Sequence, residues 1–333
     1  MLHVAIIHNQ PEADRYQAMG ESKAEFGVMD EVRAVDQALQ ELGYPHSLLP
    51  LHPPLTQVQK ALQSLQADVV FNLFEGFDGS PETESQVAGM LENLQIPFTG
   101  CPSAALKLAL DKSRTKDLLT KAGIPTPQYR ILNPDQISRF DLDYPCIVKP
   151  VAEDASHGIS ENSIVHDPAA LAKQVRKICE LFGGQAMVEE YVDGREFNTT
   201  VIGYTRLTIP AISEIVYTLP PGKPRILTFE SKWDEQSLYY THTKAVCPAP
   251  ITESEKISIG RIARKAFLLT GCRGYARIDL RQDHSGRFKV LEVNPNPDIT
   301  PGAGASLQIA AAGLSYSQFI AKMIRLALRK GVK

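Results

Sequence analysis

Short apolar runs alternate with amphipathic helical patterns through the first hundred residues, and this alternation constrains the fold more than any other feature of the sequence. Residues 4–7 and 68–74 are apolar runs typical of buried strands. Helical patterns cover residues 31–42, 56–65 and 84–94. The alternation predicts a small parallel α/β domain. Ligands of such sheets bind beyond the carboxyl ends of the strands, which directs attention to residues 72–82.

The rest of the chain predicts two further units of mixed α and β structure. The first opens with one long helical pattern at 103–123, whose closing Gly123 suits a helix C-terminus. Its further predicted elements are strands at 129–132, 145–150, around 164 and 186–192, and a helix at 168–182. The last unit is rich in strands until a capping box at Thr252 opens a helix, and it closes with a hairpin and two helices. We predict domains over residues 1–104, 105–187 and 188–333.

Composition narrows the classes of partner. The 333 residues exceed one typical domain, and 43% hydrophobic residues with 22% charged residues are ordinary for a globular chain. The net charge of -3 offers no excess of positive charge for a nucleic-acid backbone, so nucleic acid is not an expected partner. No apolar run approaches the length of a membrane span, and no basic leader precedes the first strand, so we expect no membrane association.

The cysteines and histidines argue against two other kinds of site. The five cysteines lie far apart without a Cys-x-x-Cys pair, which indicates neither a zinc site nor a disulfide framework and favours a reduced cytoplasm. The eight histidines include no His-x-x-x-His pair, and Gly-x-Ser-x-Gly is absent. Zinc-dependent hydrolysis and serine-hydrolase chemistry are therefore not expected.

The segment 275–294, "YARIDLRQDHSGRFKVLEVN", reads as two strands around a turn at "DHSG". An even loop would place Arg277 opposite Glu292 and Asp279 opposite Val290. Strand alternation then gathers polar side chains on one face: Arg277, Asp279, Glu292 and Asn294. The other face would hold the apolar side chains Ile278, Leu280, Leu291 and Val293. A solvated sheet face has the same pattern, so any one of these acids alone is weak evidence for a site.

The pair of acids next to an amide is more informative. Asp279, Glu292 and Asn294 offer only hard oxygen ligands, the set that suits Mg²⁺, and Mg²⁺ usually binds together with nucleotide phosphates. Pro295 and Pro297 then end the strand, because proline cannot donate to the ladder, and lead to the glycine-rich "TPGAGAS". A loop of that composition can bring backbone N–H groups close to an anion.

Phosphates bound with a metal also call for lysines, and three lie in suggestive places. Lys112 follows "LALD", Lys149 ends the apolar run "PCIVK", and Lys232 lies in "FESKWDE". Glu189 and Glu196 flank a turn at Gly194 and could accept hydrogen bonds from an adenine amino group or ribose hydroxyls. Each of these residues taken singly is more often a surface group.

The order of these motifs resembles that of the ATP-grasp ligases, and most closely the D-alanine-D-alanine ligase branch. The motifs are "LDKSRTKDLLTKAGIPTP", "PCIVKP", "VEEYVDGREF", "ARIDLR" and "LEVNPNP", and the similarity runs from about residue 68 to the C-terminus. The resemblance implies an ATP-grasp fold of class α/β and α+β. In that fold an N-terminal parallel α/β domain precedes two α+β units that clamp ATP between them.

The resemblance also implies roles for individual residues. Lys112 and Lys149 would hold the ATP phosphates, Glu189, Tyr191 and Val192 the base, and Glu196 the ribose. Ser156 and Gly158 would belong to a mobile lid, and Lys232 to a loop that closes on the γ-phosphate. Asp279, Glu292 and Asn294 would bind two Mg²⁺ ions, with Mn²⁺ as an alternative. Arg277 and the backbone near Gly304 would stabilise negative charge in the reaction, a carboxylate being activated as an acyl phosphate and then attacked by an amine.

The substrate positions depart from the pattern of that branch. The first strand runs into "HNQPEA", where that branch has a glycine-rich stretch with a glutamate for which Glu12 would have to substitute. Glu75 stands where a histidine is usual. Ala155 replaces a serine, Trp233 replaces a tyrosine, and Ser306 lies out of register in a longer loop. We predict Glu75, Trp233 and Ser306 as substrate residues, with an altered substrate.

Three functions remain open on the sequence, and the departures at the substrate positions favour the first of them. The first is a ligase joining an amino acid to a small acceptor in a specialised pathway, similar to the ligases of mycosporine-like amino acids. The second is a D-alanine-D-alanine ligase of peptidoglycan synthesis. The third is a nucleotide-binding regulatory protein without turnover. For either ligase we expect amino-acid and acceptor substrates, a cytoplasmic location and, because relatives are often dimers, a homodimer.

Overall fold

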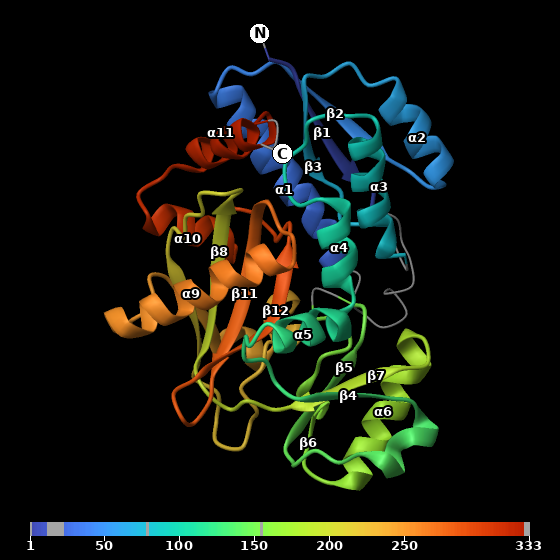
Figure 1. The fold of residues 1–333 in the computed structure, drawn as a ribbon, viewed down its shortest axis with the longest axis vertical. Coiled ribbons are helices and arrows are strands. Elements are labelled where there is room, and N and C mark those ends of the chain that lie inside the picture. The colour runs from blue at the N-terminus through green and yellow to red at the C-terminus, as the bar shows by residue number, and fades with distance from the viewer. Residues whose placement is uncertain (1, 12–22, 78–79, 154–155, 330–333) are drawn as a thin grey trace.

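The structure is a computed structural model, and it describes residues 2–11, 23–77, 80–153 and 156–329. Three sheets follow one another along its long axis (Figure 1). A parallel three-stranded sheet, β2-β1-β3, lies at the top, and an antiparallel five-stranded sheet, β10-β9-β8-β11-β12, lies in the middle. An antiparallel four-stranded sheet, β4-β7-β5-β6, lies at the bottom. This mixed α/β and α+β architecture is the predicted one.

The first sheet forms from apolar runs and is covered by amphipathic helices. Its strands are β1 (Val4–Asn9), β2 (His46–Leu51) and β3 (Val69–Leu73), and its helices are α1 (Lys23–Glu41), α2 (Leu55–Gln63) and α3 (Glu82–Asn93). Every residue of β1 and β3 is buried, as expected for parallel strands covered on both faces. The prediction of a parallel α/β unit is confirmed, although β2 was not predicted and α1 begins at Lys23, well before the predicted start at residue 31.

The four-stranded sheet carries its own core under one long helix. Its elements are β4 (Tyr129–Leu132), β5 (Cys146–Pro150), β6 (Ile164–Val165), α6 (Pro168–Phe182) and β7 (Ala186–Glu190). Asp167 caps α6 through Ala170 N, and Gly183 ends it with a left-handed φ of 96°. The predicted bounds of this helix are confirmed, and the last predicted strand ends two residues earlier than expected.

The five-stranded sheet supports the remaining elements. Its strands are β8 (Glu196–Gly203), β9 (Ile212–Tyr217), β10 (Thr243–Val246), β11 (Gly274–Gln282) and β12 (Phe288–Pro295). Two short helices, α7 (Glu230–Trp233) and α8 (Leu238–Thr241), lie between β9 and β10. The predicted capping box is present, since Thr252 and Glu255 bond reciprocally at the start of α9 (Glu253–Leu269).

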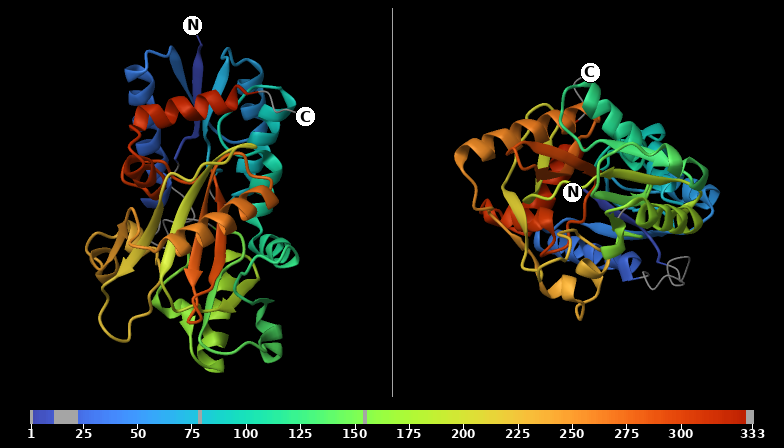
Figure 2. Two further views of the ribbon diagram at one scale, coloured as in Figure 1. Left: turned by 60° about the vertical axis from the view of Figure 1, so that its left-hand side comes forward. Right: turned by 90° about the horizontal axis from the view of Figure 1, so that it is seen from below.

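The C-terminal helices return to the first sheet. Helix α10 (Gly304–Ala311) packs on β8, and α11 (Tyr316–Ala327) packs on α1, where Figure 1 shows it in red against blue. Buried residues of β1, α1, β11 and α11 share one core, and a second core joins β3 and α3 to the strands of the middle sheet. The first and last units are therefore packed together through apolar surface, while the four-stranded sheet has a separate core. Figure 2 shows the ribbon of that sheet and α6 below the five-stranded sheet.

The long helical pattern at 103–123 forms two helices rather than one. Helix α4 (Ser103–Leu110) ends at Asp111, and α5 (Lys112–Lys121) begins after it. Asp111 has extended backbone angles, and its carboxylate accepts from Arg114 N, so it caps α5 and interrupts the pattern. The break sets the start of α5 at Lys112, which faces the cavity described below.

Within the described residues, none of the helices has the length and apolar character needed to cross a bilayer.

Candidate active site

A cavity of about 170 Å³ lies where the four-stranded and five-stranded sheets approach one another. Its walls come from β5, β7, the segment after β7, the region around Lys232, and the β11–β12 hairpin. Apolar side chains on the wall include Ile147, Ile159, Ile226 and Leu291, which suits a flat base. Most of the residues predicted for nucleotide and metal line it together: Lys112, Lys149, Ser156, Glu189, Tyr191, Val192, Glu196, Lys232, Arg277, Asp279, Glu292 and Asn294.

The hairpin register differs from the predicted one. Arg277 pairs with Asn294 and Asp279 with Glu292, because a bulge follows Asp279 and adds Leu291 to β12. The four polar side chains still share a face, since directly paired residues point to the same side of a sheet. Leu291 does not face the core as predicted, because the bulge turns it to the cavity wall.

The acids of the hairpin are held by neighbouring cations. Both oxygens of Asp279 accept from Arg277 at 2.8 Å, and Asn294 Nδ2 donates to Asp279 Oδ2 at 2.8 Å. Glu292 Oε1 lies 2.9 Å from Lys112 Nζ. Burial raises the pKa of Glu292, but the charges of Lys112 and Lys149 outweigh it and lower that pKa to about 2. The carboxylate is therefore ionised across the whole physiological range.

This donor set fits Mg²⁺. Two carboxylates and an amide reach one cavity that lysines also line, which leaves positions for phosphate oxygens and water. Among the described residues, no three His, Cys, Asp or Glu side chains form a metal-binding cluster. Mg²⁺ does not need such a cluster, because it usually binds through one or two carboxylates together with substrate phosphates.

Glu189 on β7 is clamped by two lysines. Its oxygens lie 2.7 Å from Lys149 Nζ and 2.8 Å from Lys116 Nζ, and the carboxylate is almost fully buried. Burial raises the pKa of Glu189, but the two cations outweigh it and lower that pKa. Burial likewise lowers the pKa of Lys116, against the attraction of Glu189. Both carboxylate oxygens already have partners, so an adenine amino group would compete with lysine for them.

Sequence reasoning missed Lys116. Its ammonium donates to Thr126 Oγ1 at 3.0 Å, and Thr126 in turn donates to the carbonyl of Val290 on β12. Lys116 thus connects α5 to Glu189 on β7 and, through Thr126, to β12 of the hairpin. The available signal was its spacing, because a residue four positions after Lys112 lies on the same face of a helix.

Lys232 belongs to the short helix α7 and lines the cavity. Burial and the nearby Arg277 cation lower its pKa, which Asp279 and Glu292 partly oppose. Its neighbour Trp233 does not line the cavity. The indole packs on Phe229 with ring centroids 6.3 Å apart, and a Cβ on Gly27 would lie 3.2 Å from it.

The other predicted residues lie outside the cavity wall. Gly158 has a φ of 72°, and a Cβ there would meet Phe182 at 2.7 Å, so this glycine is required by packing. Glu75 is exposed beyond β3. Ser306 is buried, and its hydroxyl donates to the carbonyls of Thr300 and Ala303. Gly304 lies beside Arg277, since a Cβ on it would be 3.8 Å from Arg277 Cδ. Glu12 and Ala155 fall outside the described residues.

Two antiparallel sheets that enclose a lysine-lined cavity, with carboxylates and an amide on a terminal hairpin, define the class as ATP-grasp enzymes. The family model described as "D-ala D-ala ligase C-terminus" matches residues 118–325. The chain therefore belongs to the D-alanine-D-alanine ligase family and is an ATP-dependent ligase that forms C–N bonds. This agrees with the prediction of ATP and Mg²⁺ as cofactors and supports an enzyme over a nucleotide-binding protein without turnover.

Relatives and solved structures agree with this family. The chain is 34% identical over 262 residues to "Uncharacterized protein y4sG" of Sinorhizobium fredii, covering 79% of this chain and 75% of the relative. It is 31% identical over 299 residues to a D-alanine-D-alanine ligase of Halorhodospira halophila, covering 89% and 90%. The fold matches the crystal structure of the D-alanine-D-alanine ligase of Bacillus anthracis complexed with ATP, with a TM-score of 0.72, 20% identity, and coverage of 99% and 98%.

Proposed function

We propose that this ligase joins two amino acids, and that both are D-alanine. The names of the characterised relatives support this reading over an amino-acid ligase of the mycosporine type. The observation that carries the ligase chemistry is the convergence of Lys112, Lys149, Lys232 and Arg277 with Asp279 and Glu292 around one cavity. That set of charges suits the transfer of a phosphoryl group to a carboxylate.

In the proposed reaction, a carboxylate oxygen of the first amino acid attacks the γ-phosphorus of ATP, and ADP leaves. The amine of the second amino acid then attacks the carbonyl carbon of the acyl phosphate. Inorganic phosphate departs, the amine loses a proton, and an amide bond remains. Mg²⁺ held by Asp279, Glu292 and Asn294 would supply charge neutralisation at the phosphates. Lys112, Lys149 and Lys232 would orient the triphosphate and offset its charge.

Arg277 is the proposed stabiliser of the oxyanion. Two of its guanidinium nitrogens are fixed by Asp279, so the group is already oriented before substrate binds. The first turn of α10 begins beside it at Gly304, where a Cβ would lie 3.4 Å from Asn198 Oδ1 and 3.8 Å from Arg277 Cδ. The unpaired N–H groups at a helix start favour negative charge. Each such donor contributes about 3 kcal/mol to the stabilisation of a tetrahedral oxyanion.

A second candidate is a ligase for a different amino acid or acceptor. It is favoured by Ser306, which points its hydroxyl at its own backbone instead of lining the cavity. The relative with 34% identity is itself uncharacterised, so it does not decide between the substrates. The cytoplasmic location and the homodimer remain predictions.

The deciding experiment incubates the protein with ATP, Mg²⁺ and D-alanine and measures phosphate release and dipeptide. Formation of D-alanyl-D-alanine with stoichiometric phosphate would support the first candidate. ADP formation that D-alanine does not stimulate, but another amino acid in a panel does, would reject it in favour of the second. A protein that binds no ATP would reject both.

A further inference from the structure

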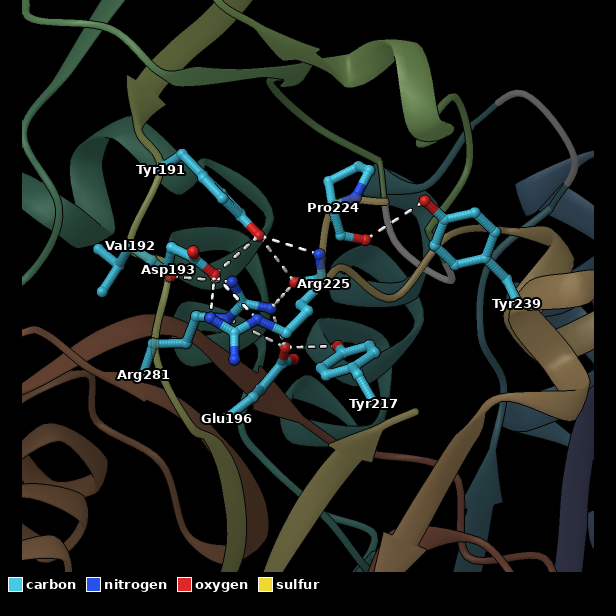
Figure 3. A network of polar contacts seen from close by, with 9 residues as sticks. All are labelled: Tyr191, Val192, Asp193, Glu196, Tyr217, Pro224, Arg225, Tyr239 and Arg281. Carbon is cyan, nitrogen blue, oxygen red and sulfur yellow. Dashed lines mark hydrogen bonds and ion pairs between the residues drawn. The ribbon is translucent and has the colours of Figure 1, made fainter. Parts of the chain in front are cut away.

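Arg281 is a buried cation that the proposed reaction does not use. It lies on β11 two residues after Asp279, with 4% of its side chain exposed. A guanidinium at that depth requires partners for its donors. Nε and Nη2 donate to Glu196 Oε2 at 3.0 and 2.6 Å, and Nη1 donates to the carbonyl of Val192 at 2.8 Å. Nη2 also donates to the carbonyl of Arg225 (Figure 3).

The two carboxylate oxygens of Glu196 differ in their hydrogen bonds. Oε2 accepts from Arg281 twice and from the hydroxyl of Tyr217 at 2.6 Å. No hydrogen bond from the described part of the chain reaches Oε1 of Glu196. The three bonds to Oε2 restrict the rotation of the carboxylate. Because Glu196 lines the cavity, Oε1 remains as an acceptor for a ligand that binds there.

The charge of Glu196 is balanced within the protein. Arg281 donates twice to Oε2, which places its guanidinium directly against this carboxylate. The rings of Tyr191 and Tyr217 lie 5.4 and 5.9 Å from the guanidinium carbon and restrict it further. A carboxylate neutralised in this way is suited to accept from neutral donors, such as the hydroxyls of a sugar, rather than to attract a cation.

Arg281 also joins the cavity to the segment that leads to Lys232. Arg225 in that segment donates from Nε and Nη2 to Asp193 Oδ1 at 3.0 and 2.6 Å. Its backbone N–H donates to the hydroxyl of Tyr191 at 3.0 Å (Figure 3). Arg281 completes this attachment through the carbonyl of Arg225. One side chain therefore contacts the base-binding segment, Glu196 and the segment before α7.

We propose that Arg281 is a positioning residue that presents Oε1 of Glu196 to the ribose hydroxyls of the nucleotide and anchors the segment before Lys232 to the same carboxylate. The proposal rests on the proposed role of the cavity as the ATP site. It assigns to Arg281 the preference of the enzyme for ribonucleotides over deoxyribonucleotides, although the residue itself does not touch the reacting atoms.

The test measures the dissociation constants of ATP, 2′-deoxy-ATP and 3′-deoxy-ATP by calorimetry in the presence of Mg²⁺. We expect the wild-type protein to prefer ATP over at least one deoxy analogue by about tenfold, the effect of one hydrogen bond to a charged group. Arg281→Met should weaken ATP binding to the level of that analogue, so that the ratio approaches one. Tyr217→Phe, which removes one bond to Oε2, should lower the ratio less.

Arg195→Met is the matched control. Arg195 precedes Glu196 and pairs with Glu214 at 2.7 Å and Glu255 at 3.2 Å, but it does not line the cavity. Its replacement also removes an ion-paired guanidinium, and we expect the ratio between ATP and the deoxy analogues to stay at the wild-type value. A general loss of stability would weaken all three nucleotides equally, whereas a positioning role changes their ratio.

The possible outcomes test the proposed function and the role of Arg281 separately. A wild-type protein that binds no ATP rejects the proposed function itself. A wild-type protein that binds ATP without preferring it over either analogue overturns the role of Arg281, and so does a folded Arg281→Met variant with an unchanged ratio. If Arg281→Met does not fold, Arg281→Lys replaces it. Lysine keeps the charge but cannot make the forked contact, so an unchanged ratio in that variant also refutes the proposal.

Discussion

Oε1 of Glu292 lies 2.9 Å from Nζ of Lys112, so a carboxylate on the last strand of the middle sheet is paired with the first residue of α5. The two residues have different proposed partners, a metal ion for Glu292 and phosphates for Lys112. Their contact balances charge within the protein. When nucleotide and metal bind, phosphate and Mg²⁺ would have to replace the two partners of this ion pair. Lys149 and Asp279 line the same cavity and would likewise take a phosphate and a metal ion as partners.

Glu292→Gln tests the metal assignment. The amide keeps the shape of the side chain but loses the charge, so we expect Mg²⁺-dependent ADP formation to fall by about 100-fold or more. A titration of Mg²⁺ at saturating ATP measures the change. Glu253→Gln is the control, because the Glu253 side chain is 72% exposed on α9 and pairs with Lys256 at 3.5 Å, at the surface. Near-normal turnover by Glu292→Gln would show that Glu292 is not a metal ligand.

Lys116→Met tests the buried clamp on Glu189. Without Lys116, Glu189 keeps Lys149 but loses the partner of its other oxygen, and we expect a loss of about 3 kcal/mol in the free energy of unfolding. Urea denaturation measures it. Lys121→Met on the exposed end of the same helix should change this free energy by less than about 0.5 kcal/mol. If the ion pair between Lys116 and Glu189 accounts for this loss, Lys116→Met should lower the free energy of unfolding by less when Glu189 is already replaced by glutamine. Equal costs in both backgrounds would contradict this explanation.

Local patterns in the sequence were sufficient for most of the fold. The helix at Pro168–Phe182 has a cap, a continuous apolar face and a closing glycine, and its bounds were predicted. The helical pattern at 103–123 was misleading, because apolar periodicity continues across Asp111 while the carboxylate of that residue caps a new helix. A cap inside a periodic pattern depends on the backbone angles of one residue, which periodicity does not report.

The site residues that follow from the alternation of side chains along a strand were predicted. Those whose role depends on contacts between residues distant in the sequence were not. Asp279 and Glu292 share a face because paired residues do so in either register, and the bulge at Leu291 was not visible. Lys116 and Arg281 were missed for a related reason. Their roles come from carboxylates 73 and 85 residues away, on Glu189 and Glu196, and single-sequence patterns do not reveal such pairs.

Gly100→Ala tests the attachment of the loop after β12 to the first unit. Asn296, with a φ of 48°, accepts from Cys101 N at 2.7 Å, and a Cβ on Gly100 would lie 2.3 Å from Asn296 Oδ1. The φ of 92° at Gly100 adds strain. We expect a loss of more than about 2 kcal/mol in the free energy of unfolding. Gly123→Ala, with a φ of 69° and open space around it, should cost only about 1 kcal/mol. Equal losses in urea would show that contact with Asn296 contributes nothing.

Glu31→Gln tests a protonated acid beneath the same loop. Glu31 is 4% exposed on α1, and its Oε1 accepts from Ile299 N at 2.7 Å. Burial raises the pKa of Glu31 well above its usual range, and the charges of Glu75 and Asp298 raise it further. The folded protein therefore keeps a proton that the unfolded chain releases above about pH 4.3.

The sign of the pH dependence follows from that proton. A group with a raised pKa in the folded state contributes stability that is fully present below the unfolded pKa, and this stability is lost as the pH rises through the folded pKa.

Glutamine cannot titrate, yet it keeps the acceptor for Ile299 N. We therefore expect Glu31→Gln and wild type to have similar melting temperatures near pH 4.5, and the variant to become the more stable of the two at pH 8. Glu180→Gln, at an exposed position on α6, is the control for the removal of a surface carboxylate. A Glu31→Gln variant that loses stability relative to wild type as the pH rises would mean that Glu31 is ionised in the folded protein. In that case the bond from Ile299 would be a charge-assisted bond that holds the loop, and glutamine would weaken it.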